Sequence, residues 1–285
     1  MNLLYGLAYI LAAPALGGLT VGLDRIITAR MQGRVGPPLL QPFYDVAKLF
    51  EKEKAVVARS QNLFVLAYVV FMAFTGMLFF SGGDFLLVIF ALTLSHIFLV
   101  LGAYSANSPY SFIGAERELI QIMAFEPMIL LAASGMYLVT KSFYISDIVR
   151  TQVPLVLLLP GLFLGLLYVL PIKLRKSPFD LSTSHHAHQE IVKGITTEFS
   201  GSTLGRVEIA HWYETVLLLG FVYLFFSFNP LLALIAVALT YVLELFIDNN
   251  YTRFKWALAL KSAWLVALVL GMGNIALLWY YMKGL

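Results

Sequence analysis

The chain has 285 residues, of which 60% are hydrophobic and 12% are charged, and its mean hydropathy is +0.84. Soluble domains are roughly 45–50% apolar, so the composition excludes an ordinary soluble protein and indicates an integral membrane protein. The net charge is only +3 and there is no cysteine, which excludes disulfides and thiolate ligation of zinc, nickel or iron–sulfur clusters by this chain.

Long apolar runs without residue-by-residue alternation predict helices and not a β-barrel. The first run has no basic region ahead of it and reaches spanning length, so we interpret it as a span and not as a signal peptide. We expect an all-α integral membrane protein, one membrane domain over residues 1–285. Eight transmembrane helices are predicted, at residues 3–27, 63–80, 85–106, 119–140, 154–170, 208–228, 230–247 and 256–282.

Two long polar connections, residues 28–62 and 171–207, separate these apolar runs. If alternate connections lie on one side, all 19 Lys and Arg residues except Lys141, Arg150 and Lys283 fall on the side of both long loops. Basic residues concentrate on the cytoplasmic side of membrane proteins. We therefore expect a multi-pass protein of the cell membrane with both long loops in the cytoplasm and both termini outside.

The first long loop contains a turn and then a helical pattern. Gly and Pro residues in GRVGPP, residues 33–38, cannot continue a helix. Residues 41–54 then place apolar side chains on one face and charged ones on the other, which predicts an amphipathic helix in the membrane interface. A brace between two spans and a lid over a lateral opening are both open interpretations.

Carboxylates in the fourth span are candidates for proton transfer, because ionisable groups inside a membrane are costly. Glu126 directly precedes Pro127 and follows Glu118 by eight residues, about 12 Å along a helix and about 80° around it. This spacing favours two steps of a proton relay. The alternative is that Glu126 pairs permanently with Arg117 or with a histidine and locks the helices together.

The sixth span carries Glu208, His211 and Glu214 at intervals of three residues, so they share one side of a helix. An imidazole between two carboxyl groups can exchange protons near neutral pH, and we assign all three to the relay. A cluster at headgroup level is the alternative, supported by the neighbouring Trp212 and Tyr213.

The second long loop contains His185, His186, His188 and Glu190. Their H-H-x-H-x-E spacing has no His pair four residues apart, as in zinc proteases, and no cysteine accompanies it. We therefore predict no metal site. A solvated or partner-contacting group of titrating side chains is the preferred interpretation.

Four stretches together resemble one family: GRVGPPLLQPFYDVAKLFEKE, YSFIGAERELIQIMAFEP, KSPFDL and EIVKGITTEFSG. This family is the eight-span membrane subunit of respiratory complex I that adjoins the quinone site, with its relatives in membrane-bound [NiFe] hydrogenases and formate hydrogenlyases. The resemblance implies a subunit that anchors a peripheral redox arm and passes charge along a line of glutamates. The residues that match the family's motifs are Arg117, Glu126, Asp180, Glu190, Glu198 and, in the hydrogenase branch, Glu208.

Departures from the complex I pattern indicate which branch of the family this chain resembles. Complex I has A-E-T-N-R before PFDL and a G-E-S-E run after it, whereas this chain has residues 172–176 and the histidine-rich residues 182–190 in those places. The histidine-bearing loop followed by E-F-S-G resembles the hydrogenase branch. On this resemblance, quinone is not an expected ligand.

The resemblance therefore implies the anchor and proton-relay subunit of a ferredoxin-dependent, energy-converting [NiFe] hydrogenase, which couples hydrogen evolution to proton or sodium-ion translocation. No cofactor is expected in this chain, and the [NiFe] centre and iron–sulfur clusters belong to partners. Expected partners are hydrogenase-like large and small subunits, an iron–sulfur subunit, antiporter-like membrane subunits and the lipid bilayer, but no nucleic acid. The relay is assigned to Glu118, Glu126, Glu190, Glu198, Glu208, His211 and Glu214, and the loop under the peripheral arm to Arg117, Asp180, His185, His186 and His188.

Two sets of alternatives remain open at this stage. The same architecture could serve a sulfur reductase, a formate hydrogenlyase or a quinone-reducing complex, which differ in the metal-binding residues of partner chains. An independent secondary transporter could use the same carboxylates. The span pattern shows no convincing inverted repeat, and the long basic loops favour a docked partner.

Overall fold

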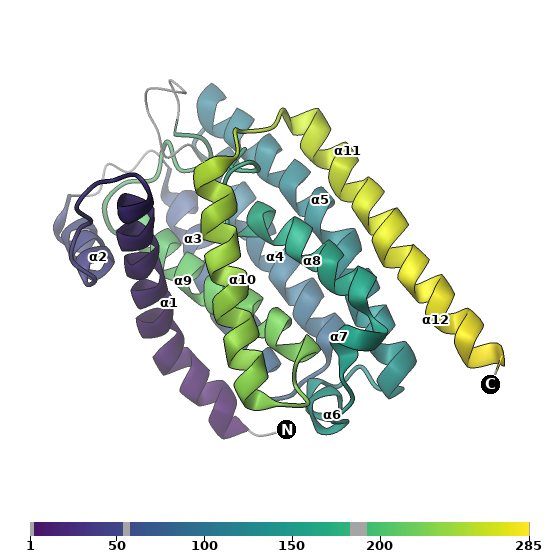
Figure 1. Ribbon diagram of the computed structural model, residues 1–285. Helices are drawn as coiled ribbons and strands as arrows, with labels where there is room; N and C mark the ends of the chain where they lie inside the picture. The colour runs from purple at the N-terminus through teal and green to yellow at the C-terminus, as the bar shows by residue number, and fades with distance from the viewer. Residues whose placement is uncertain (1–2, 54–57, 183–192, 285) are drawn as a thin grey trace.

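The computed structural model describes residues 3–53, 58–182 and 193–284, and within these residues the chain is helical apart from turns, loops and isolated bridge positions, among them the pair Asp84 and Tyr144. Figure 1 shows the long helices side by side in one bundle, with the two termini at the same end. The helices are α1 (Leu3–Met31), α2 (Gln41–Glu51), α3 (Arg59–Phe80), α4 (Phe85–Tyr104), α5 (Pro109–Thr140), α6 (Ile145–Arg150), α7 (Leu155–Leu158), α8 (Pro160–Lys173), α9 (Gly201–Phe225), α10 (Pro230–Asn250), α11 (Trp256–Val266), the π-helix η1 (Ala267–Met272) and α12 (Gly273–Gly284).

Seven helical segments of the described chain are long and apolar enough to cross a membrane: α1, α3, α4, α5, α9, α10 and the continuous stretch from α11 through α12. The predicted fifth span is different, because it divides into the single turn α7 and the 14-residue α8. Eight uninterrupted spans are therefore not confirmed. Pro160 explains the break, since proline has no N–H to continue the helical ladder and its ring disfavours helical geometry at Leu159.

The backbone groups released at this break are bonded by one side chain from the end of the chain. The Oδ1 atom of Asn274, in α12, accepts hydrogen bonds from the backbone N–H of Gly161 at 2.9 Å and of Leu162 at 3.2 Å. Its Nδ2 donates to the carbonyl of Leu158 at 3.2 Å. Asn274 thus satisfies both sides of the interrupted helix, which an apolar environment requires.

Asn274→Ala should destabilise the protein by about 1–2 kcal/mol, because two part-buried donors and an acceptor at the α7–α8 break lose their partner. Thermal unfolding of the purified protein in detergent measures this change. Asn250→Ala is the matched control, since that exposed side chain donates to the carbonyl of Phe246 in its own helix and bridges no break. Equal effects of the two substitutions would contradict this role for Asn274.

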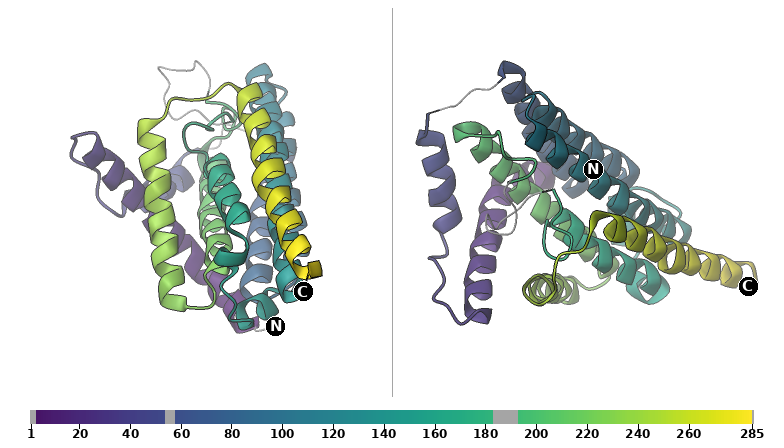
Figure 2. Two further views of the ribbon diagram at one scale, coloured as in Figure 1. Left: turned by 45° about the vertical axis from the view of Figure 1, so that its right-hand side comes forward. Right: turned by 90° about the horizontal axis from the view of Figure 1, so that it is seen from above.

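Helix α2 forms within the segment predicted to be helical and ends at Glu51. Its Val46 is buried, and the ring of Phe43 lies 5.0 Å from that of Trp212 in α9. Tyr44 and Phe50 are exposed, so apolar side chains lie on both the packed and the open side of this helix. Figure 2 shows α2 at the edge of the bundle, beside α1. Its position in the membrane interface remains a prediction.

Helix α9 lies at the centre of the bundle and contacts α1, α2, α3, α8 and α10. It is joined to α1 by two reciprocal hydrogen bonds, from Tyr9 Oη to the carbonyl of Tyr213 at 2.8 Å and from Tyr213 Oη to the carbonyl of Ile10 at 2.7 Å. Gly17 of α1 lies against the backbone of Trp212. These contacts fix the helix that carries Glu208, His211 and Glu214.

Candidate functional site

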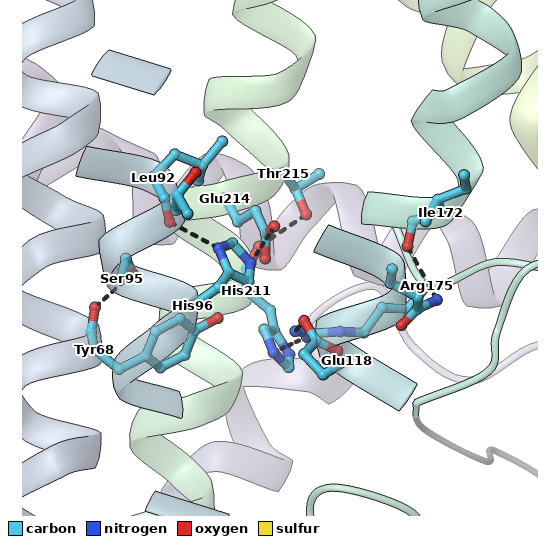
Figure 3. Close-up of polar contacts among 12 residues, drawn as sticks. Tyr68, Leu92, Ser95, His96, Glu118, Ile172, Arg175, His211, Glu214 and Thr215 are labelled. Atoms are coloured by element: carbon cyan, nitrogen blue, oxygen red, sulfur yellow. Dashed lines mark hydrogen bonds and ion pairs between the residues drawn. The ribbon is translucent and has the colours of Figure 1, made fainter. Parts of the chain in front are cut away.

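A cluster of ionisable side chains lies between α4, α5, α8 and α9, inside the apolar bundle (Figure 3). Isolated charges are too costly to bury, so such groups must be paired. Five of the six are buried and His211 is half-buried. The buried polar cluster, as we call it, consists of His96 from α4, Glu118 from α5, Lys173 at the end of α8, Arg175 just after it, and His211 and Glu214 from α9.

Arg175 links two members of the cluster. Its Nη2 lies 3.2 Å from Oε1 of Glu118, and its Nη1 contacts Nε2 of His211. A guanidinium only donates, so Nε2 of His211 accepts and this imidazole is neutral. Burial alone would lower the pKa of Arg175, but the Glu118 carboxylate raises the pKa above its ordinary value, so Arg175 stays charged.

His96 and Glu214 form the second pair of the cluster. His96 Nε2 lies 2.8 Å from Oε1 of Glu214, and the two side chains are 0% and 3% exposed. His96 Nδ1 lies 2.9 Å from the carbonyl oxygen of Leu92. The ring of Tyr68, from α3, meets the His96 ring edge-on with centroids 5.9 Å apart. An imidazole held between a carboxylate and a carbonyl therefore lies within the core.

This arrangement differs from the expectation for the sixth span. We predicted that His211 would lie between Glu208 and Glu214, but its Nε2 contacts Arg175 instead, and Glu214 pairs with His96. His96 was not singled out from the sequence. The sequence did indicate it, because His96 is the only histidine inside the apolar run 85–106. Ionisable residues at membrane depth are functional candidates.

Glu126 lies apart from the Glu118 pair, at the contact between α4 and α5. It is partly buried and accepts a hydrogen bond from the hydroxyl of Thr93. Arg117, the ion-pair partner considered for Glu126, donates instead to the carbonyl of Leu181 at 3.3 Å. Lys173 lies near enough to interact electrostatically with both Glu118 and Glu126, the two carboxylates that the sequence pointed to.

The loop after α8 is tied to the bundle at several points. Asp180 accepts two hydrogen bonds from Arg253, at 2.9 and 2.5 Å, and Gln121 of α5 donates to the carbonyl of Phe179 at 2.5 Å. The backbone carbonyl of Glu198 accepts from Gln61 at 3.3 Å. Asp180 therefore holds the loop against the segment before α11.

The remaining loop candidates, His185, His186, His188 and Glu190, lie outside the described residues. In the ranges 3–53, 58–182 and 193–284, no group of three or more His, Cys, Asp or Glu side chains is arranged to hold a metal ion. Whether the loop histidines bind a metal therefore stays a matter of prediction.

A cavity of about 1090 Å³ opens between α1, α2, α9, α10 and the segment after α8. Its wall includes Lys173, Arg175, His211 and Glu214 of the buried polar cluster, and also Glu208. His96 and Glu118 do not line it. The cluster thus has one side toward the cavity and one side toward the protein core.

Ion pairs line the rest of the cavity. Lys176 Nζ lies 2.7 Å from Asp24 and 3.8 Å from Asp248, and Arg25 lies 2.6 Å from Asp45 on α2. Burial would raise the pKa of Asp45, but its hydrogen bonds with Arg25 and Gln41 lower that pKa below its ordinary value. The cavity is therefore bordered by both signs of charge.

An all-helical bundle with helices long enough to span a membrane and a buried charged cluster beside a cavity defines a multi-pass membrane protein. The sequence matches the NADH dehydrogenase family over residues 4–279. The chain belongs to this family, and the resemblance to the complex I-like membrane subunit is confirmed.

Relatives of the chain are components of multi-subunit oxidoreductases. Hydrogenase-4 component C of Escherichia coli is 29% identical over 99% of this chain and 96% of its own length. A subunit of the NADH-quinone oxidoreductase of Bacillus cytotoxicus is 30% identical over 96% of this chain and 92% of its own. The fold matches a chain in the structure of the membrane-bound sulfane sulfur reductase, an archaeal respiratory membrane complex, with a TM-score of 0.82, 23% identity and coverage of 95% and 98%.

Proposed function

We propose that this chain is the membrane anchor and proton-relay subunit of a ferredoxin-dependent, energy-converting [NiFe] hydrogenase, coupling hydrogen evolution to proton or sodium-ion translocation. The observation that supports the proposal best is the buried polar cluster, which reaches a cavity on one side and the core on the other. Buried, paired ionisable groups between membrane helices are typical of proton paths. No other part of the described chain gathers as many ionisable side chains inside the bundle.

The relay begins, in this proposal, at the cavity with Glu208, His211 and Glu214 and continues inward. Glu118 pairs with Arg175 and does not line the cavity. Lys173 interacts electrostatically with Glu118, Glu214 and Glu126. Glu126 is the exit from the cluster toward the antiporter-like subunits, because it lies about two turns further along α5 than Glu118 and contacts α4. The long loops lie in the cytoplasm, where residues 171–207 bind the peripheral arm that holds the metal centres.

The hydrogenase assignment is favoured by the relative from hydrogenase-4 and by the histidine-rich loop in place of acidic positions. The equivalent component of a sulfur reductase, a formate hydrogenlyase or a quinone-reducing complex is the alternative, since relatives of the chain include a component of NADH-quinone oxidoreductase. Quinone is not a proposed ligand. An independent transporter is disfavoured because the relatives are parts of larger complexes.

Glu126→Gln should reduce ion uptake per molecule of hydrogen evolved while hydrogen evolution itself persists, because an amide cannot carry the proton and the redox centres lie in other chains. Uptake into membrane vesicles and hydrogen evolution are measured together. Glu116→Gln is the control, an exposed glutamate near the start of the same helix. Unchanged uptake per hydrogen in Glu126→Gln would exclude a role for this carboxylate.

Purification of the chain in mild detergent, followed by mass spectrometry of the co-purifying proteins, tests the choice of complex. We expect iron–sulfur proteins and a large subunit with the cysteine ligands of a nickel–iron centre. A large subunit without those cysteines would favour the sulfur- or quinone-reducing alternatives. A chain that purifies alone or only with copies of itself would support the transporter.

A further inference from the structure

The contacts of His96 fix how many hydrogens this imidazole and its carboxylate partner share. The carbonyl of Leu92, 2.9 Å from Nδ1, can only accept, so Nδ1 carries a hydrogen. Nε2 lies 2.8 Å from Glu214 Oε1, within ion-pair distance, and one hydrogen on either atom removes the repulsion between two bare acceptors. Either the imidazolium faces a carboxylate, or the neutral imidazole faces a carboxylic acid.

Both arrangements hold one exchangeable proton and leave the pair with no net charge, which suits a fully buried position. Interconversion needs only that the Nε2–H bond breaks as the Glu214 O–H bond forms, or the reverse. Complete loss of the proton would leave two facing acceptors in the core. The geometry is therefore that of a site that binds a proton and releases it when the two side chains separate.

We propose that His96 and Glu214 form a proton-binding site that exchanges its proton with the cavity through Glu214 and holds it on the core side through His96. Glu214 lines the cavity, whereas His96 does not and is fully buried. The two residues lie on different helices, α4 and α9, so movement of one helix relative to the other would open the pair. The use of this site in ion translocation rests on the proposed function, but its occupancy by a proton does not.

Ionisable side chains of the surrounding elements act on the pair. They include Tyr9 from α1, Tyr68 from α3, Glu118 from α5, Lys173 from α8, Arg175 after α8 and His211 from α9. In their ionised forms Lys173 and Arg175 balance Glu118 and Glu214, and His211 is neutral because it accepts from Arg175. Glu126 also interacts with Lys173, so a proton on His96 leaves the three carboxylates and three cations of this region in balance.

Infrared difference spectra of the purified complex, taken across a pH titration with histidine rings labelled with ¹³C, test this proposal. We expect one labelled imidazole band and one carboxyl band to titrate with a common midpoint. Both should be lost in His96→Asn and in Glu214→Gln, and both should persist in Ser95→Ala, which alters a buried neighbour that bonds Tyr68 instead. Lys173→Met should raise the midpoint by about one pH unit, because a nearby positive charge is removed.

A histidine band that is unchanged in Glu214→Gln, or the absence of any band that depends on His96, would overturn the proposal. Because Glu214→Gln and Lys173→Met leave the imidazole in place, they decide the matter even if His96→Asn does not assemble. Ion uptake per hydrogen evolved is measured on the same variants. Loss of the bands without a change in uptake supports the proton site and counts against the relay, so the two proposals can fail separately.

Discussion

Arg175→Met should lower the free energy of unfolding by about 3–5 kcal/mol, because it leaves the buried Glu118 carboxylate without its cationic partner. The substitution also removes the donor to His211 Nε2. Methionine keeps much of the volume of the arginine stem. The lost stability therefore comes mainly from the missing charge and its hydrogen bonds, and less from a cavity. Denaturant unfolding of the purified protein in detergent measures the change.

Arg25→Met is the matched control, since its ion pair with Asp45 is even shorter, at 2.6 Å, but the two side chains are 43% and 38% exposed. An exposed pair contributes about 0–1 kcal/mol. Similar losses in the two variants would contradict the view that burial decides the strength of the Glu118 contact. The double substitution Glu118→Leu with Arg175→Met should recover part of the stability, because an apolar pair needs no charge compensation.

The sequence predicted the helical class and most of the spans, because runs of about 20 apolar residues have few other stable structures. It also contained the break in the fifth span, since Pro160 follows only six residues after Pro154. The composition of the run outweighed this signal, and one continuous helix was predicted. The π-helical turn at residues 267–272 has no comparable signal, because it depends on packing of the last span against α5 and α8.

The buried cluster was predicted only in part. Helical spacing places His211 and Glu214 on one side of α9, but it does not say which neighbouring helix each one meets. The partners turned out to be Arg175 and His96, which lie 36 and 118 positions away from them in the sequence. Such long-range pairs follow from how α4, α5 and α9 pack, and one sequence does not carry that information.

Gly17→Leu should prevent α1 from packing against α9 and so reduce the amount of folded protein in the membrane. A Cβ atom at Gly17 would collide with the carbonyl oxygen of Trp212 and lie 2.7 Å from its Cα. These are backbone atoms of a packed helix, so they cannot rotate away as a side chain could. Even Gly17→Ala should cost about 1–3 kcal/mol through overpacking. Yield after membrane extraction and thermal unfolding measure the two variants.

Gly273→Ala is the control, because no atom lies within 4 Å of the position a Cβ would take there. If Gly17→Ala is as well tolerated as Gly273→Ala, then α1 and α9 are less closely packed than the structure has them. The consequence would extend beyond stability. Trp212 is the residue after His211 and two before Glu214, so a displaced α9 would also move the carboxylate that faces His96. We therefore expect Gly17→Ala to shift the titration midpoint of the His96–Glu214 pair as well.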